Sequence, residues 1–231
     1  MSLEFLHCSQ DKSTNSAIQA DPSAVPARFE ADVLVIFFES DGIRGSLVEL
    51  DEATGGLLQQ LHERREITGK PYECIPLYNP RGLACKQLLV VGIGSHKQVN
   101  AGTLYEASGA AARQLSCKPR ATVGFLADGN WSNDQLEQAV AGATMGTSGQ
   151  DLYRSEKQQI PFEKTVWLQA PVEVVQRGHI IGDGITLARR LVNMPADDLY
   201  PETFAEEAAT IAGRVGPVSY THLRAHETPC H

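Results

Sequence analysis

The sequence predicts an α/β protein in which a central sheet is flanked by helices. Uninterrupted apolar runs of strand length alternate along the chain with longer segments of helical character. Some of these runs, such as Ala31–Phe38 and Lys86–Gly94, are apolar at nearly every position, which is the pattern of strands buried on both faces. This alternation and this double burial indicate the fold class.

The first half of the expected sheet comes before position 95. The run Ala31–Phe38 is the first buried strand, and Glu49–Glu63 is expected to be a helix after it. Two further strands, Pro71–Tyr78 and Lys86–Gly94, follow with the turn sequence NPRG between them.

The second half alternates helix and strand again. Gly102–Leu115 is an alanine-rich helix, Ala121–Ala127 is a buried strand, and Lys164–Ala170 is a last short strand. Between these two strands, Ser132 and Gln135 have the spacing of a capping box, which predicts a helix from there to about Thr147.

Two helices follow the last strand. Pro171 suits the first turn of a helix that runs to Asn193, and Pro201 opens a shorter one that runs to about Ala212. The longer helix contains three glycines, Gly178, Gly182 and Gly184. Because a glycine weakens a helix by about 1 kcal/mol relative to alanine, we expect these three to permit close packing against another element.

The chain is expected to divide into four parts. Residues 1–30 are polar and broken by two prolines, which predicts a flexible leader. Residues 31–170 hold the sheet and its helices, and residues 171–216 hold the two helices that begin a second domain. Residues 217–231 show neither helical nor strand periodicity and do not resemble the rest of the chain.

Composition indicates a water-soluble globular protein. Of the 231 residues, 42% are hydrophobic, and 28 acidic against 20 basic residues give a net charge of −8, which argues against nucleic acid as a partner. No apolar stretch is long enough to cross a membrane and no secretory signal is recognisable, so we expect a cytoplasmic protein. Five scattered cysteines are then expected to be reduced: Cys8, Cys74, Cys85, Cys117 and Cys230.

Three short motifs suggest phosphate or nucleophile chemistry, and each lacks a required residue. VVGIGSHK has Lys97 where a dinucleotide loop needs its third glycine, so Gly92 and Gly94 are interpreted as a turn at a strand end. TGKP at Thr68–Pro71 lacks the first glycine and the hydroxyl residue of a P-loop. Ser148 in GTSGQ lacks the flanking glycines and the preceding strand of a serine elbow.

The carboxy-terminal tail gathers side chains of the metal-ligand type, namely His222, His226, Glu227, Cys230 and His231. A zinc helix of the HExxH type needs its second histidine at the position of Cys230. We therefore expect no metal site there. Between Val33 and Gly216, no acid pair, histidine pair or nucleophile forms a recognisable catalytic constellation.

The segment ITLARRLVNMPADDLYPETFAEEA, Ile185–Ala208, resembles the stretch that leads into the catalytic domain of leucyl aminopeptidases. Upstream, ADVLVIFF, a TGK after a helix, LLVVGIG and an alanine-rich helix occur in the order seen in the amino-terminal domain of that family. The resemblance covers the chain from Ala31 to Gly216. Two departures, Tyr200 in place of a usual threonine and Ala196-Asp197 in place of Pro-Asn, weaken a helix cap and leave the resemblance intact.

This resemblance implies a macro-like α/β amino-terminal domain around a mixed sheet, followed by the truncated first helices of an α/β catalytic domain. It also implies a hexamer in which two divalent ions, zinc or manganese, activate a water that hydrolyses amino-terminal residues, leucine preferred, from peptides. Without the rest of the catalytic domain, Ile181, Ile185 and Leu191 are expected to be exposed and to favour association.

The metal and catalytic segments of the family resemble G-K-G-x-T-F-D-S-G-G and N-T-D-A-E-G-R, and neither occurs in this sequence. We therefore assign no catalytic, cofactor-binding or metal-binding residue to any position, and expect this fragment alone to be inactive and metal-free. The tail sequence SYTHLRAHET resembles translated sequencing-adaptor DNA, which predicts that residues 217–231 are not native. The alternative that stays open is a macro-like module that binds an ADP-ribose type of ligand, or serves assembly, without catalysis.

Overall fold

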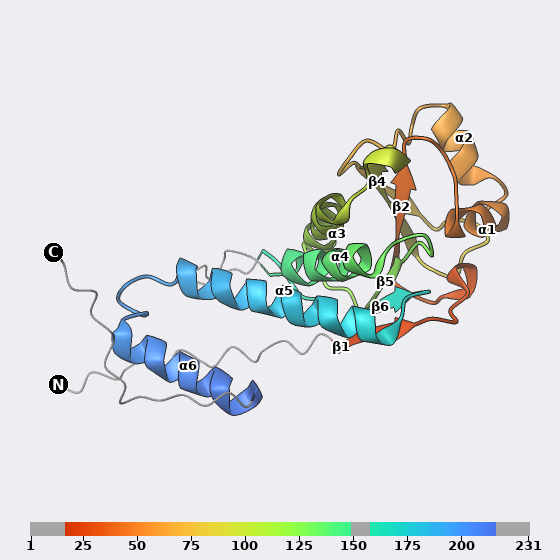
Figure 1. Ribbon diagram of the computed structural model, residues 1–231. Helices are drawn as coiled ribbons and strands as arrows, with labels where there is room; N and C mark the ends of the chain where they lie inside the picture. Colours follow the sequence, from red (N-terminus) through yellow and green to blue (C-terminus); the bar gives the residue numbers. More distant parts are fainter. Residues whose placement is uncertain (1–16, 149–157, 216–231) are drawn as a thin grey trace. The chain divides into compact units, whose positions relative to one another are not determined.

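A computed structural model describes residues 17–148 and 158–215, and its centre is a six-stranded sheet in the order β1-β6-β5-β2-β4-β3 (Figure 1). Strand β3 is antiparallel to β4, and the other neighbouring strands are parallel. The predicted α/β class with a mixed sheet is therefore confirmed. The strands are β1 (Ala17–Asp21), β2 (Val33–Glu39), β3 (Cys74–Tyr78), β4 (Gln87–Gly94), β5 (Thr122–Leu126) and β6 (Lys164–Leu168).

Helices connect the strands close to where the sequence predicts them. The predicted capping box is confirmed, because Oγ of Ser132 accepts a hydrogen bond from the Gln135 N–H and the Gln135 side chain accepts one from the Ser132 N–H. The helices are α1 (Ser46–Ala53), α2 (Leu57–Glu63), α3 (Ala101–Leu115), α4 (Asn133–Gly146), α5 (Val172–Asn193) and α6 (Pro201–Val215), with short 3₁₀ turns η1 (Pro26–Arg28) and η2 (His96–Gln98).

The sheet is covered on both faces, so the central strands are apolar throughout. On β2, alternate residues beginning at Val33 join a cluster with α3, α4 and α5, while those beginning at Leu34 join a cluster with α1 and α2. Every residue of β2 and β4 is buried. Full burial of one such apolar side chain contributes about 1.5–3 kcal/mol to the stability of the fold. The side chains of β2 and β4 therefore supply a large part of the stability of the domain.

The predicted flexible leader is wrong from residue 17 onward. Residues Ala17–Asp21 form β1, which pairs in parallel with β6 in a register that joins Ala17 to Lys164. The Gln169 N–H also donates to the Asp21 carbonyl at 2.8 Å. Because β1 is an edge strand with half-exposed, partly polar residues, its sequence lacks the continuous apolar run that marks the central strands.

The single helix predicted over residues 49–63 is two helices. Gly55 and Gly56 separate α1 from α2, and both have left-handed backbone angles, with φ of 72° and 80°. Asp51 joins the two pieces, since its Oδ1 accepts hydrogen bonds from the N–H groups of Leu58 at 2.7 Å and Gln59 at 3.2 Å. A side chain from α1 therefore satisfies the free donors at the start of α2.

Close packing is confirmed for two of the three glycines of α5. A Cβ at Gly178 would meet the carbonyl oxygen of Glu137 at 2.6 Å, and one at Gly182 would meet the Thr144 Cβ at 2.6 Å. Nothing lies within 4 Å of a Cβ at Gly184, so the expectation for that position is wrong. Gly184 is exposed, so no contact at this position requires a glycine.

The described residues form two compact units, which divide between Thr186 and Leu187, within α5. The expected boundary at residues 170/171 lies earlier, because Val174 and Val175 of α5 are buried in the core of the first unit. In the second unit, Arg190 and Glu207 form a bidentate ion pair, with contacts of 3.2 and 2.7 Å.

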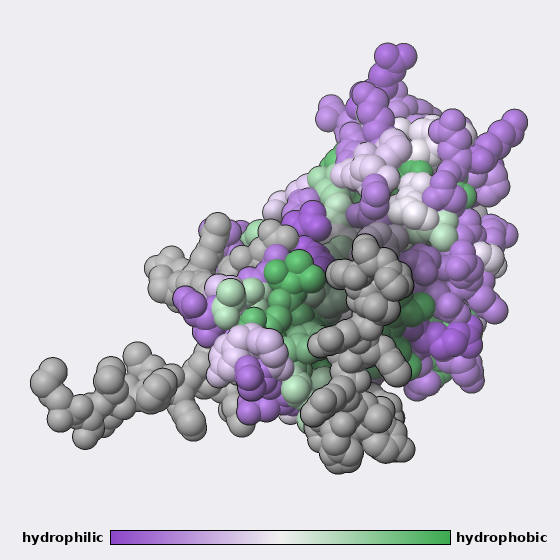
Figure 2. Space-filling view, turned by 60° about the vertical axis from the view of Figure 1, so that its left-hand side comes forward, coloured by the Kyte–Doolittle hydropathy of each residue, from purple (hydrophilic) through white to green (hydrophobic). Residues whose placement is uncertain are grey.

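Apolar side chains of α5 are exposed to different extents. Ile181 is 36% exposed, as expected, whereas Ile185 and Leu191 are half-buried, and Ile180 and Val192 are more exposed than any of these. On the face shown in Figure 2, hydrophobic residues reach the surface among polar ones. Among the described residues, no helix is long and apolar enough to cross a membrane. The tail at 217–231, with its ligand-type side chains, lies outside the described residues.

Candidate functional site

A pocket lies at the carboxyl ends of β2, β4 and β5, where the topology of the sheet diverges. The connection that leaves β2 leads through α1 and α2 to β3 and β4 on one side, whereas the one that leaves β5 leads through α4 to β6 on the other. In α/β proteins, ligands bind outside the carboxyl ends of the strands at such a switch point. This pocket is therefore the candidate site.

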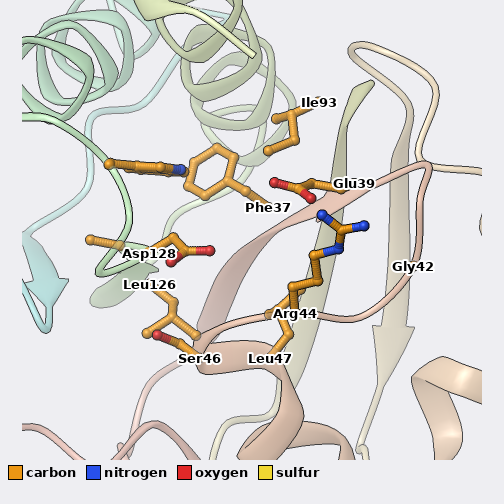
Figure 3. A pocket seen from close by; sticks show the side chains of 11 residues that line it. Phe37, Glu39, Gly42, Arg44, Ser46, Leu47, Ile93, Leu126 and Asp128 are labelled. Atoms are coloured by element: carbon orange, nitrogen blue, oxygen red, sulfur yellow. The ribbon is translucent and has the colours of Figure 1, made fainter. Parts of the chain in front are cut away.

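The pocket encloses about 10 Å³, which is close to the room that one water molecule needs. Its walls combine apolar side chains with three charged groups, which face each other across the opening (Figure 3). The lining residues are Phe37, Glu39, Gly42, Arg44, Ser46, Leu47, Ile93, Leu126, Ala127, Asp128 and Trp131.

Glu39, the last residue of β2, is the most buried charged group of the pocket, at 9% exposed. Its Oε1 lies 2.8 Å from Nδ1 of His96, a distance at which the ring N–H donates to the carboxylate. Its Oε2 is buried and has no hydrogen-bond partner among the residues that the structure describes. One half of this carboxylate is therefore satisfied and the other half is not.

The loops around Glu39 are fixed by hydrogen bonds between neighbouring strand ends. Oδ2 of Asp41 accepts hydrogen bonds from the backbone N–H of His96 at 2.8 Å and from the Ser95 hydroxyl at 2.9 Å. These two bonds hold the pKa of Asp41 below its usual value. The loop after β2 is thus tied to the loop after β4, which positions Glu39 and His96 together.

The opposite wall of the pocket is built by the end of β5 and the start of α1. Oδ1 of Asp128 accepts hydrogen bonds from the backbone N–H of Asn130 at 2.9 Å and its side-chain amide at 3.0 Å. The Ser46 hydroxyl donates to Oε1 of Gln169 at 2.7 Å, so that hydroxyl already has an acceptor. An aromatic pair, Phe37 and Trp131, adds an apolar wall.

The two glycine motifs near the strand ends have structural roles. A Cβ at Gly92 would come within 1.9 Å of the Lys70 carbonyl oxygen, and Gly94 has a φ of 81°. The expected turn is not formed by Gly92 and Gly94, because both lie within β4, at its carboxyl end, where they let the Thr68–Pro71 loop lie against the strand. That loop is closed by Glu73, whose Oε2 accepts bonds from the Thr68 N–H and hydroxyl and from the Gly69 N–H. GTSGQ lies partly outside the described residues.

One further cluster, Thr144, His179 and Asp183, has residue types of a catalytic triad. Nδ1 of His179 lies 3.5 Å from the Thr144 hydroxyl, and its Nε2 lies 3.4 Å from Oδ2 of Asp183. The Thr144 hydroxyl donates to the Val140 carbonyl at 2.9 Å within its own helix. Because its proton already has a backbone acceptor and the contacts are long, this hydroxyl is not an activated nucleophile.

Metal chemistry has no support in the described part of the chain. No group of three or more His, Cys, Asp or Glu residues there lies close enough together to hold a metal ion. The residues present therefore do not fit the two-metal centre that the sequence resemblance implies. We derive no hydrolytic step from them.

Comparison with known proteins decides the family. The profile described as "Cytosol aminopeptidase family, N-terminal domain" matches residues 34–157, more than half of the chain. The chain belongs to the cytosol aminopeptidase family. The family resemblance predicted from the sequence is confirmed, and the pocket at the ends of β2, β4 and β5 lies within the matched amino-terminal domain.

Relatives and solved structures agree with this assignment. A "Probable cytosol aminopeptidase" of Geotalea uraniireducens is 32% identical over 87% of this chain and 43% of its own length, and one of Rhodopirellula baltica is 29% identical over 72% and 33%. A mutant of tomato leucine aminopeptidase matches with a TM-score of 0.73 and 20% identity over 90% of this chain and 44% of its own. The bottromycin maturation enzyme BotP, solved in complex with Mn, matches with a TM-score of 0.61 and 24% identity over 80% and 37%. The last two likenesses show the fold, and this cytosol aminopeptidase family chain spans less than half the length of these relatives.

Sequence reasoning missed all three charged residues of the pocket, Glu39, Arg44 and Asp128. A usable signal was present for two of them, since Glu39 ends β2 and Asp128 follows β5 closely. Polar residues at the carboxyl ends of parallel strands converge on one edge of the sheet. Arg44 carries no comparable signal, because it lies in a loop.

Proposed function

We propose that this chain is the amino-terminal part of a metal-dependent aminopeptidase that removes amino-terminal residues, leucine preferred, from peptides. The observation that carries the proposal is the match of residues 34–157 to the amino-terminal domain of the cytosol aminopeptidase family. The names of the relatives support peptide hydrolysis as the reaction of the whole enzyme. The proposal places the enzyme in the cytoplasm.

Within this proposal, hydrolysis belongs to the part of the relatives that this chain does not cover. The sequence contains neither of the segments that resemble the family's metal and catalytic motifs, and the described residues do not form a metal-binding group. The intact enzyme would use two divalent ions, zinc or manganese, and the Mn complex of BotP is consistent with manganese. The 231-residue chain alone would then bind no such pair and release no leucine.

The proposed role of the described domain is structural, in assembly of a hexameric enzyme. The alternative of an ADP-ribose type of ligand has weaker support, because the pocket has room for about one water molecule. An adenine nucleotide needs a pocket of several hundred Å³. The observations therefore favour the aminopeptidase proposal over the nucleotide-binding module.

The experiment joins this chain to a catalytic part. A chimera of residues 1–216 with the remaining carboxy-terminal part of the Geotalea uraniireducens relative is assayed with a chromogenic leucine substrate and added manganese or zinc. We expect metal-dependent release of leucine from the chimera and none from the 231-residue chain under the same conditions. The carboxy-terminal part of the relative alone serves as the control for the contribution of residues 1–216.

Two results would count against the proposal. Leucine release by the 231-residue chain would show that hydrolysis does not need the missing motifs. A chimera that assembles, as measured by light scattering, and binds manganese, yet shows no hydrolysis, would argue that this amino-terminal part does not belong to a peptide hydrolase.

A further inference from the structure

The buried carboxylate of Glu39 lacks a donor that its surroundings would be expected to supply. Glu39 is 9% exposed, and while Oε1 is bonded to His96, Oε2 is buried without a hydrogen-bond partner among the described residues. An unsatisfied buried acceptor is costly and is uncommon in folded proteins. Figure 3 shows this carboxylate at the pocket, near the Arg44 guanidinium. Because Glu39 lines the pocket, a group that binds there lies beside this carboxylate.

Two more charged groups line the same small space. Oδ1 of Asp128 takes both of its hydrogen bonds from Asn130, and its Oδ2 accepts none from the described residues. Arg44 is exposed, and among the described residues it has no ion-pair partner. In Figure 3 the Asp128 carboxylate lies across the pocket from Glu39 and Arg44. Two carboxylates and one guanidinium make a site with both signs of charge.

The size and the walls of the pocket limit what can enter it. Its volume of about 10 Å³ admits a group as small as a water molecule, and an ammonium group is of that size. Phe37 and Trp131, with ring centroids 5.1 Å apart and planes at 64°, form an aromatic wall beside the charges. Trp131 is half-buried and lines the pocket.

We propose that this pocket binds a free amino acid with an apolar side chain. Its ammonium group enters between the Glu39 and Asp128 carboxylates. Its carboxylate stays at the mouth beside the Arg44 guanidinium, and its side chain lies against Trp131. An ammonium with three donors suits two carboxylates, and a guanidinium suits a carboxylate.

The chemistry of the walls disfavours the other small occupants. A metal ion needs more oxygen or nitrogen ligands than Glu39 and Asp128 supply, and no larger group of such ligands exists in the described part of the chain. The positive charge of Arg44 also opposes a bare cation. An isolated anion would be repelled by the two carboxylates. A zwitterion satisfies all three charges.

The test uses the 231-residue chain, which lacks the family's catalytic motifs, so that leucine binding is measured without hydrolysis. Calorimetric titration with L-leucine is compared with leucinamide, which lacks the carboxylate, and with 4-methylpentanoate, which lacks the ammonium. We expect saturable binding of leucine and about tenfold weaker binding of leucinamide, since loss of a charge-assisted contact weakens affinity by about that factor. We expect no binding of 4-methylpentanoate, because its carboxylate would meet two carboxylates without an ammonium group.

Two variants assign the contacts. Glu39→Gln removes the charge and keeps the shape, and we expect leucine affinity to fall about tenfold or more. Arg44→Gln changes an exposed residue and should weaken leucine while leaving leucinamide unchanged. Glu49→Gln, an exposed carboxyl on α1 outside the pocket, is the matched control and should bind leucine as the parent chain does.

Circular dichroism and thermal unfolding confirm that each variant is folded before titration. If Glu39→Gln does not fold, the leucine-against-leucinamide contrast of Arg44→Gln still tests the site. Absence of saturable leucine binding by the folded parent chain would overturn the proposal, because the pocket would then hold water only. Equal leucine affinity in folded Glu39→Gln, or in Arg44→Gln, would overturn it as well.

Discussion

Gly178 of α5 lies so close to Val140 of α4 that a Cβ built at position 178 would come within 2.7 Å of the Val140 Cβ. The carbonyl oxygen of Glu137 would lie 2.6 Å from the same atom. Next to this contact, Arg177 donates from Nε to Oε1 of Glu137 at 2.6 Å. The missing side chain at 178 therefore sets the distance between the two helices.

The contact predicts opposite effects of alanine at two positions of α5. Gly178→Ala is expected to lower the free energy of unfolding by about 1–2 kcal/mol, because overpacking outweighs the gain in helix propensity. Gly184→Ala, where nothing lies within 4 Å, should raise it by about 0.5–1 kcal/mol. Urea unfolding followed by circular dichroism measures both. A stabilising Gly178→Ala would contradict the close packing.

The Thr68–Pro71 loop is predicted to depend on the Glu73 carboxylate. Its Oε2 receives bonds from the Thr68 N–H at 3.0 Å, the Thr68 hydroxyl at 3.0 Å and the Gly69 N–H at 3.1 Å. Glu73→Ala leaves these donors unpaired and should cost about 1–3 kcal/mol of unfolding free energy. Glu66→Ala, an exposed carboxyl nearby, should change it by less than about 0.5 kcal/mol. Equal effects of the two substitutions would argue against a closing role for Glu73.

Asp32 predicts a specific dependence of stability on pH. The pKa of Asp32 is lowered, first by its hydrogen bond to the Lys86 ammonium at 2.7 Å and, against some desolvation, by the N–H groups of Ala121 and Thr122. A carboxyl whose folded pKa is depressed stabilises the fold above its unfolded pKa of about 3.9, and this contribution is lost as the pH falls through the folded pKa.

The measurement is thermal unfolding of the parent chain and of the Asp32→Asn variant from about pH 7 to about pH 2. This interval extends to both sides of the usual carboxyl pKa of about 4. The difference in stability should be largest near neutrality and should shrink as the pH falls below about 4. A difference that stays constant across this range would show that the charge of Asp32 does not contribute.

The described cysteines are predicted to react with alkylating agents at different rates. Burial raises the pKa of the Cys74 thiol to about 11, and it also raises the pKa of Cys85, which is buried. Cys117 is exposed. Since the thiolate is the reactive form, Cys117 should be alkylated by iodoacetamide near pH 8 about a hundredfold faster than Cys74.

Peptide mass spectrometry after timed alkylation gives the order. In urea the three rates should converge, which serves as the control for intrinsic differences between the sites. Equal rates in the folded protein would contradict the burial of Cys74 and Cys85.

The core strands and most helices could be predicted because their signals are local. The runs that became β2 and β4 are apolar at successive positions, and the Ser132 and Gln135 pair that caps α4 is three residues apart. Strand β1 could not be predicted in this way, because pairing with β6 makes it a strand and Lys164 is distant in the sequence. The break between α1 and α2 could have been predicted from the adjacent glycines Gly55 and Gly56, because glycine is unfavourable within a helix.

By itself, the sequence determined the α/β class, the family and the absence of the family's catalytic motifs, because apolar periodicity and short motifs are written in consecutive residues. Only the tertiary structure decided that Glu39, Arg44 and Asp128 line one pocket, since three segments meet there through the parallel pairing of β2 with β4 and β5. It also decided that Gly178 is needed for packing and Gly184 is not. Whether a side chain has room, or a carboxylate has a donor, depends on neighbours that chain order does not specify.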